Sequence, residues 1–331
     1  MAARRHDRCG GEIAGLGAAA WPLAARAQQS ALPVIGLVMN GSAEPFARSV
    51  AGFHKGLGET GYVDGHNVTV EYHSLEYGYV DLPVLMADLV RRRVAVIAVP
   101  YNPRAALAAK AATTTIPIVF GVGEDPVRLG LVASLARPGG NATGINSFQQ
   151  EVVGKRLGLL HELVPKAVRV AVLGSPANLS FGHALQDVRE AARIIGLQIQ
   201  ILNARTVGEI DAAFATLARE RPDALWVVSN AFFISQRVQI ISLAARDRIP
   251  AAYDDRVYVA AGGLMSYGTD IAATYRQVAV YTGNILKGAK PADLPVVQST
   301  KFEFVLNLRT AKALGIEVSP QLLAITDEVI E

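Results

Sequence analysis

The chain repeats one order of strands and helices in two successive halves, and this repeat limits the fold more than any other feature. Short apolar runs bounded by Gly, Pro and polar residues alternate with amphipathic stretches, which is typical of a parallel sheet covered by helices. The expected strands are 34–39, 68–73, 94–99 and 116–120 in the first half, and 170–173, 198–202, 224–228 and 249–253 in the second. Corresponding strands begin roughly 130 residues apart, a period far too long for a solenoid.

The last strand of each half strengthens the repeat by its local sequence. Leu-Ala-Ala-Lys at 107–110 precedes one of these strands, and Leu-Ala-Ala-Arg at 243–246 precedes the other. Both strands begin with Ile-Pro and end in an acidic pair, at 124–125 and at 254–255. The pattern therefore predicts two copies of one lobe, with chance alignment of generic α/β units as the alternative.

The predicted fold class is α/β, with two doubly wound parallel-sheet lobes joined by hinge crossings. A chain of 331 residues is long enough for two such domains. We expect an N-terminal lobe from 32–144 plus about 270–288, and a C-terminal lobe from 145–269 plus about 296–331. The Gly- and Pro-rich run 137–144 is expected to cross between the halves, and Pro126 to begin a helix.

The first 27 residues are typical of an export leader. Arg4, Arg5 and Arg8 precede an apolar run, and Ala-Arg-Ala at 25–27 has the small-x-small form of a cleavage site. The run is too short to span a membrane, and no later segment has the length of a transmembrane helix. We therefore expect a soluble periplasmic protein exported by the Sec or twin-arginine route, with a disordered start as the alternative.

Composition excludes several classes of function. A hydrophobic content of 51% and a charged content of 18% fit a globular protein and exclude a disordered chain. The net charge of +3 comes from scattered Lys and Arg residues, which do not form a nucleic-acid surface. The single cysteine, Cys9, lies in the leader, so the body has no disulfide, thiolate metal site or cysteine nucleophile.

Catalytic and cofactor motifs are also missing from the sequence. The six histidines are dispersed, and the chain contains no HExxH, paired CxxC, GxSxG or phosphate-binding loop. Gly121 and Gly123 begin a dinucleotide fingerprint, but Pro126 stands where its third glycine is required. We therefore predict no catalytic residue, no bound metal and no cofactor.

Polar and aromatic residues instead follow the expected strands at matching positions in both lobes. Open α/β sheets bind ligands at the carboxyl ends of their strands, so these residues are candidates to line a site between the lobes. The candidates are Asn40, Ser42, Tyr101, Asn102 and Asp125 in the first lobe, and Ser175, Asn178, Asn230, Phe232, Tyr253, Asp254, Ser266 and Tyr267 in the second. Each candidate also has an ordinary interpretation as a turn former, helix cap or core residue.

The residue types suit an amino acid or a related small carboxylate. Asp125 and Asp254 are candidates to pair with an ammonium group. Ser42, Ser175 and nearby backbone amides are candidates to hold a carboxylate. The aromatic side chains that could stack on a ligand ring are Tyr101, Phe232 and Tyr267.

Short motifs along the chain also resemble those of a known family. Asp-Pro-Val at 125–127, followed by Arg-Pro-Gly-Gly-Asn-Ala-Thr-Gly at 137–144, is the most specific combination. Further matching segments are 56–62, 115–119, 262–264 and 286–293. With these motifs the chain resembles ABC-transporter substrate-binding proteins of the family that includes bacterial tryptophan- and tyrosine-binding lipoproteins. The resemblance covers essentially the whole mature chain and implies a type I periplasmic-binding-protein fold.

The favoured function is an extracytoplasmic solute-binding protein of an ABC importer, not an enzyme. Its expected partners are a small-molecule ligand and the permease subunits of the membrane complex, which a monomer would contact only peripherally. The alternative is a two-lobed glycosyltransferase or sugar-nucleotide epimerase, which needs a basic phosphate clamp and a catalytic carboxylate or histidine. A ligand-sensing regulator is a third possibility, but no residues remain for its DNA-binding or signalling domain.

Overall fold

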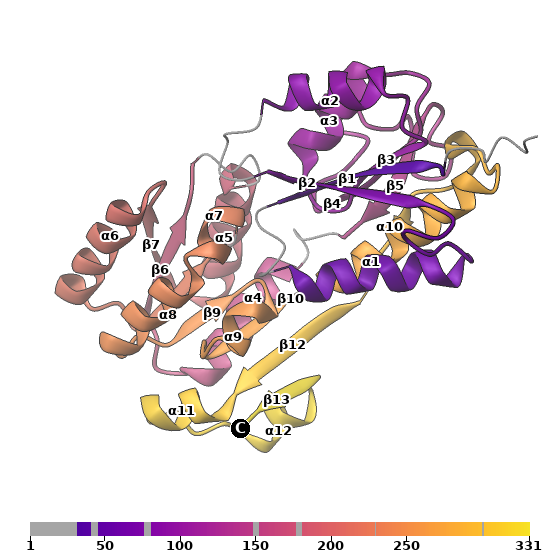
Figure 1. The fold of residues 1–331 in the computed structure, drawn as a ribbon. Coiled ribbons are helices and arrows are strands. Elements are labelled where there is room, and N and C mark those ends of the chain that lie inside the picture. Colours follow the sequence, from indigo (N-terminus) through magenta and orange to yellow (C-terminus); the bar gives the residue numbers. More distant parts are fainter. Residues whose placement is uncertain are drawn as a thin grey trace, which may run out of the picture. The chain divides into compact units, whose positions relative to one another are not determined.

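The computed structural model describes residues 32–40, 46–75, 81–147, 152–176, 181–228, 230–299 and 301–331, without the side chains of Asn40 and His183. The predicted leader, 1–27, lies outside these residues. The described strands form two sheets, one of six strands and one of seven (Figure 1). In the described part of the chain, no helix combines the length and the apolar character needed to cross a membrane.

The six-stranded sheet is parallel throughout, in the order β11-β5-β4-β3-β1-β2. Its strands are β1 (Val34–Asn40), β2 (Thr69–Leu75), β3 (Val96–Val99), β4 (Ile118–Val122), β5 (Ala142–Asn146) and β11 (Val297–Gln298). Helices α1 (Ala47–Glu59) and α10 (Ile271–Leu286) cover one face, and α2 (Leu82–Arg91) and α3 (Pro103–Ala112) cover the other (Figure 1).

Alternating side chains explain how both faces of this sheet are buried. Along β1, Leu37 packs with α1 and α10, whereas Val38 packs with α2 and α3. Along β3, Val96 likewise packs with α1 and α10, and Ile97 packs with α2 and α3. Successive residues of a strand point to opposite faces, so a sheet covered on both sides needs continuous apolar strands.

The seven-stranded sheet has the order β13-β12-β10-β9-β8-β6-β7, and β10 and β12 are its antiparallel pair among the described strands. Its strands are β6 (Arg169–Gly174), β7 (Gln198–Asn203), β8 (Ala224–Val227), β9 (Ala251–Tyr253), β10 (Met265–Thr269), β12 (Phe302–Asn307) and β13 (Glu328–Ile330). One face packs against α4 (Val152–Leu163) and α5 (Phe181–Ile195), and the other against α6 (Val207–Glu220), α7 (Ala231–Ser235) and α8 (Arg237–Arg246). The remaining helices are α9 (Arg256–Ala260), α11 (Leu308–Leu314) and α12 (Pro320–Ala324).

The two sheets share one strand order, which confirms the predicted fold class. The first five strands in chain order are arranged β2-β1-β3-β4-β5 in one sheet and β7-β6-β8-β9-β10 in the other. In this order the direction of winding reverses between β1 and β3, and between β6 and β8, and ligands bind at the carboxyl ends of strands around such points. The proposed lobe boundaries stay predictions, and below we use "lobe" for a sheet with its covering helices.

Helices α1 and α10 approach each other closely because two glycines of α1 face α10. A Cβ added to Gly56 would lie 2.1 Å from the carbonyl oxygen of Arg276, and one added to Gly52 would lie 2.5 Å from that of Ala272. Both distances are far shorter than van der Waals contact, so residues 52 and 56 must be glycine for the helices to pack as they do.

Among the described residues, the chain crosses from one lobe to the other after Ser147, at Thr269–Ile271 and between Ser299 and Phe302. These crossings contact one another, because the Thr269 hydroxyl donates to the Ser147 carbonyl (3.2 Å) and Lys301 Nζ pairs with Asp270 Oδ2 (3.2 Å). The expected crossing at 137–144 is therefore wrong. Asn141 Nδ2 donates to the carbonyls of Thr113 and Ile116, and β5 then pairs with β4 inside the six-stranded sheet.

The helix expected to begin at Pro126 is also wrong. Residues 126–130 form hydrogen-bonded turns, with the Leu131 amide bonded to the Pro126 carbonyl. Gly130 has a φ of +74°, a left-handed conformation that ends a helical turn. Leu131 is then buried in the core against α2 and α3, so the chain turns inward before a helix can form.

Candidate ligand-binding site

A charged cluster lies at the carboxyl ends of the strands of the seven-stranded sheet. Arg156 of α4 is only 3% exposed, and its Nη1 lies 3.3 Å from Oδ1 of Asp254, directly after β9. Arg156 Nε donates to the Tyr267 carbonyl (2.6 Å), and its guanidinium lies 5.1 Å from the centre of the Trp226 ring. Trp226 Nε1 donates to the same Asp254 oxygen (2.8 Å). The pair is thus held rigidly, as a buried ion pair must be to offset its loss of hydration.

Tyr101, directly after β3, packs against the core of the six-stranded sheet, and charges of this cluster act on its phenol. Burial and the negative charges of Asp254, Asp255 and Glu124 hold the pKa of Tyr101 well above its ordinary value, while Arg156 opposes them. The phenol therefore stays protonated and can donate a hydrogen bond. Groups from β3, β4, β9 and α4 act on one another here, so polar side chains of both lobes gather beside the switch points.

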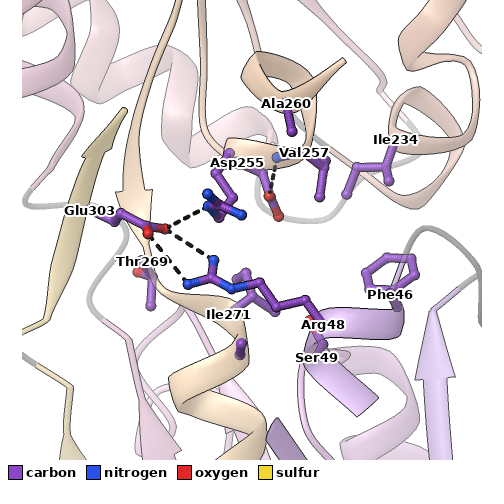
Figure 2. A pocket seen from close by; sticks show the side chains of 12 residues that line it. Phe46, Arg48, Ser49, Ile234, Asp255, Val257, Ala260, Thr269, Ile271 and Glu303 are labelled. Atoms are coloured by element: carbon purple, nitrogen blue, oxygen red, sulfur yellow. Dashed lines mark hydrogen bonds and ion pairs between the residues drawn. The ribbon is translucent and has the colours of Figure 1, made fainter. Parts of the chain in front are cut away.

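A cavity of about 80 Å³ lies between residues of both lobes (Figure 2). It is lined by Phe46, Arg48, Ser49, Ile234, Asp255, Arg256, Val257, Ala260, Thr269, Ile271, Ala272 and Glu303. Typical small-molecule sites enclose about 300–1,000 Å³, so this cavity alone is too small for an aromatic amino acid.

Asp255 supplies a carboxylate to this cavity (Figure 2). Its Oδ1 accepts a hydrogen bond from the Val257 amide (2.9 Å) and caps α9. Burial and the charges of Asp254 and Glu303 raise the pKa of Asp255 to about 6, against the opposing effects of the Val257 amide and Arg256. This carboxylate is therefore poorly compensated by the protein at neutral pH.

Glu303 joins the lobes on the other side of the cavity (Figure 2). It lies on β12, and its two carboxylate oxygens accept from Nη1 and Nη2 of Arg48 on α1, each at 3.4 Å. Arg256 Nε lies 3.4 Å from Glu303 Oε2, and the same guanidinium pairs with Glu328. The result is a chain of alternating charges that runs from α1 to β13.

Three predicted site residues serve as caps. Asn102 accepts from the Ala105 amide (2.8 Å) at the start of α3, and Asn230 accepts from the Phe233 amide (2.9 Å) at the start of α7. Asp125 is exposed and accepts from the Val127 amide (2.8 Å) in the turn after β4. Capping uses the acceptor oxygen, and the buried Nδ2 of Asn230 has no hydrogen-bond partner among the described residues. Asn230 can therefore cap α7 and still donate to a ligand.

The predicted aromatic residues of the seven-stranded lobe pack on that sheet or its helices to different degrees. Tyr253 is 1% exposed and stacks on Tyr258 at 4.5 Å, inside the core of the seven-stranded sheet. Tyr267 contacts Phe302 and Phe304, at 6.1 and 6.3 Å, on the same sheet. We assign both rings to packing. Phe232 is half-buried at the start of α7, which leaves it beside Asn230 at the switch point.

The predicted serines and the remaining loop residues are less informative. Ser175, directly after β6, is 5% exposed, and Ser266, within β10, is 1% exposed. Ser266 Oγ has no hydrogen-bond partner among the described residues. Ser42 and Asn178 lie outside the described residues, as does the side chain of Asn40, whose backbone ends β1 opposite Leu75.

Sequence reasoning missed several residues that the structure gathers here. Arg156 was detectable as a charged residue at a buried position of α4, where Val152, Val153, Leu157 and Leu160 are buried as well. Trp226, inside a buried strand, and Phe46, directly before α1, gave no comparable signal, because apolar residues at such places are ordinarily core.

Two sheets of one strand order, joined at adjacent crossings, with polar groups gathered beside their switch points, define a two-lobed binding protein of the type I periplasmic kind. The structure is similar to an ABC domain in complex with L-Trp from Streptococcus pneumonia, with a TM-score of 0.81 and 24% identity over 90% of this chain and 100% of that one. It is also similar to a ligand-free, open substrate-binding protein from Clostridium difficile, with a TM-score of 0.67 and 24% identity over 91% and 99%.

The sequence comparisons establish the family. The profile of the family described as ABC transporter substrate binding protein matches residues 35–330, and the chain belongs to this family. A tyrosine-binding protein of Clostridioides difficile (strain R20291) is 26% identical over 266 residues, which are 80% of this chain and 76% of that protein. The family and these relatives are substrate-binding proteins rather than enzymes, so the glycosyltransferase alternative is not favoured.

Proposed function

We propose that the protein is the extracytoplasmic solute-binding component of an ABC importer and that its ligand is an amino acid with an aromatic side chain. The observation that carries this proposal is the rigid pair of Arg156 and Asp254, with Tyr101 of the other lobe beside it. The pair lies at the edge of the sheet where doubly wound folds bind ligands. Substrate-binding proteins of ABC transporters act outside the cytoplasm, which agrees with the predicted export leader.

The chemistry of the described residues supports a zwitterionic ligand. Asp254 is fixed by two donors, Arg156 and Trp226, and so presents a preorganised carboxylate toward an ammonium group. Asn230 Nδ2, which has no partner among the described residues, is a donor for the ligand carboxylate. Tyr101 and Phe232 come from opposite lobes and suit the two faces of a ring.

The names of two relatives favour the aromatic class. One relative is named a tyrosine-binding protein, and a similar structure holds L-Trp. A ligand that contacts both lobes favours the state in which both sets of contacts are made, so binding is expected to close the lobes. The closed form would then deliver the ligand to the permease as a monomer that contacts only the membrane complex.

A thermal-shift panel tests the proposal. The purified protein is heated with the twenty amino acids, with sugars and with UDP-sugars, since a ligand that binds only the native state raises the melting temperature. We expect L-tyrosine or L-tryptophan to give the largest shift, without turnover. A shift with UDP-sugars alone would sink the proposal, and a shift with aliphatic amino acids alone would restrict it to another ligand class.

A further inference from the structure

We infer that the first turn of α1 is a latch for lobe closure: Phe46 and Arg48 attach it to the seven-stranded sheet and thereby set ligand affinity. This inference rests on the proposed function in one respect, namely that a ligand binds between the lobes. Neither residue belongs to the predicted ligand set. Both act by positioning α1, which is the next described element after β1 in the chain.

Phe46 is the apolar part of the latch. It precedes α1 on the six-stranded side, yet its ring is only 6% exposed and is buried in a cluster whose other members all belong to the seven-stranded sheet and its helices. Figure 2 shows the ring at the cavity, across from Ile234 and Val257. The lobes therefore cannot separate without exposing this side chain to water.

The position of Phe46 makes its burial more informative. It is the N-cap residue of α1, and its side chain makes no capping hydrogen bond. Ser, Thr, Asp and Asn are favoured at that position because their oxygens satisfy free helix amides. A phenylalanine cannot make that hydrogen bond, so any stability that Phe46 adds comes from its contact with the other lobe.

Arg48 is the ionic part of the latch. It reaches Glu303, whose side chain is 15% exposed, with two hydrogen bonds of 3.4 Å. Glu303 is paired on its other side with Arg256 (3.4 Å), which belongs to the same lobe as Glu303. If the lobes opened, Glu303 would still be paired with Arg256. Arg48 therefore stabilises the closed form less than Phe46 does, but it acts on the same equilibrium between open and closed forms.

The latch shifts the balance between open and closed forms before the ligand acts. The apparent dissociation constant of a ligand equals its intrinsic value divided by the fraction of protein in the binding-competent form, so a larger fraction gives tighter binding. Exposing a buried phenylalanine side chain corresponds to about a 10- to 100-fold change in an equilibrium constant. We therefore expect Phe46→Ala to weaken binding within that range, chiefly through faster dissociation, and Arg48→Gln to weaken it by only a few-fold.

The test compares these variants with two controls from the same helix. Phe53→Ala removes a ring that is 0% exposed in the core of the six-stranded sheet, and Glu59→Gln breaks an ion pair with Arg276 of α10. Small-angle X-ray scattering of the ligand-free proteins measures the radius of gyration. Stopped-flow fluorescence with L-tyrosine and L-tryptophan measures dissociation rates.

The inference expects a larger radius of gyration and faster dissociation for Phe46→Ala and Arg48→Gln, with neither change in the controls. An unchanged radius together with unchanged or tighter binding in Phe46→Ala would overturn it, since the ring would then be a structural residue or would obstruct the ligand. If Phe46→Ala does not fold, Glu303→Gln replaces it. The latch is then overturned if the radius of gyration and the dissociation rate both stay unchanged in Glu303→Gln. If the unaltered protein binds neither amino acid, the proposed ligand class fails, and the scattering comparison alone still decides the inference.

Discussion

Helix α1 carries two buried phenylalanines about two turns apart, and they belong to different cores. Phe53 lies in the body of the helix and packs with α10 on the six-stranded sheet. Phe46 lies at the helix start and packs with the seven-stranded sheet. The comparison separates two effects of burial: in the body of α1 it stabilises one lobe, and at the start it holds two lobes together.

The neighbouring contacts follow the same division. Gly52 and Gly56 bring the body of α1 against the backbone of α10, whereas Arg48, near the start, reaches Glu303 on β12. Changes in the body should therefore alter the free energy of unfolding, and changes at the start should alter lobe closure and ligand affinity.

Phe53→Ala should have the largest effect on stability. Removing a fully buried phenylalanine costs about 3–5 kcal/mol of unfolding free energy, because apolar contact is lost and a cavity remains. Phe46→Ala should cost less than half as much, since the ring packs at the contact between the lobes and borders the cavity. Urea denaturation of both variants measures the difference, and equal losses would contradict the division.

Gly56→Ala should destabilise the contact between α1 and α10. The new Cβ would lie 2.1 Å from a backbone oxygen that cannot move independently, so we expect a loss of about 3 kcal/mol. The matched control is Gly58→Ala, on the same helix, where a Cβ would meet nothing within 4 Å. That control should gain about 0.5–1 kcal/mol from helix propensity. Thermal denaturation that shows similar shifts for both variants would disprove the close packing.

Asp255→Asn should stabilise the protein at neutral pH. The pKa of Asp255 is raised to about 6, so the folded protein holds this proton more tightly than the unfolded chain, whose pKa is near 3.9. The stability contributed by the protonated form is present at about pH 4 and is lost as the pH rises through 6. The amide keeps the cap of α9 without the charge, so we expect a gain of about 1–3 kcal/mol at pH 7.5 and of about 1 kcal/mol or less at pH 4.5. A gain of equal size at both pH values would exclude a charge effect.

Arg48→Gln should have the smallest effect on stability. The Arg48 side chain is 48% exposed and Glu303 retains Arg256, so the melting temperature should fall by less than about 3 °C. Melting curves at low and high salt measure this shift, which should shrink as salt screens the pair. A larger, salt-independent fall would mean that Arg48 supports the fold itself.

The regular parts of the fold could be predicted from the sequence. The strands expected at 34–39, 224–228 and 249–253 match β1, β8 and β9, because a continuous apolar run marks a buried parallel strand locally. The parallel, doubly wound arrangement of both lobes also followed from the alternation of strands with helices. By contrast, β10 is not among the expected strands, because Met265–Thr269 is short and pairs with β12, which is distant in the sequence.

The candidate site was less predictable, and for a physical reason. Asn102, Asn230 and Asp125 follow strands as ligand-binding residues do, but the same side chains also cap helices and turns. Tyr253 follows the same pattern and is a core residue. The contacts of Arg156 with Asp254, and of Phe46 with the other lobe, join residues far apart in the chain, which local patterns cannot show.

Isothermal titration of the purified protein with L-tyrosine and L-tryptophan, beside the variant Asp254→Asn, tests the central claim that an amino acid is held between the lobes. We predict one-to-one binding with a negative heat-capacity change, and a loss of at least about 10-fold in affinity for Asp254→Asn, because a charged hydrogen bond to the ammonium group is weakened. Binding of equal strength to the variant, or no binding of either amino acid, would contradict the account.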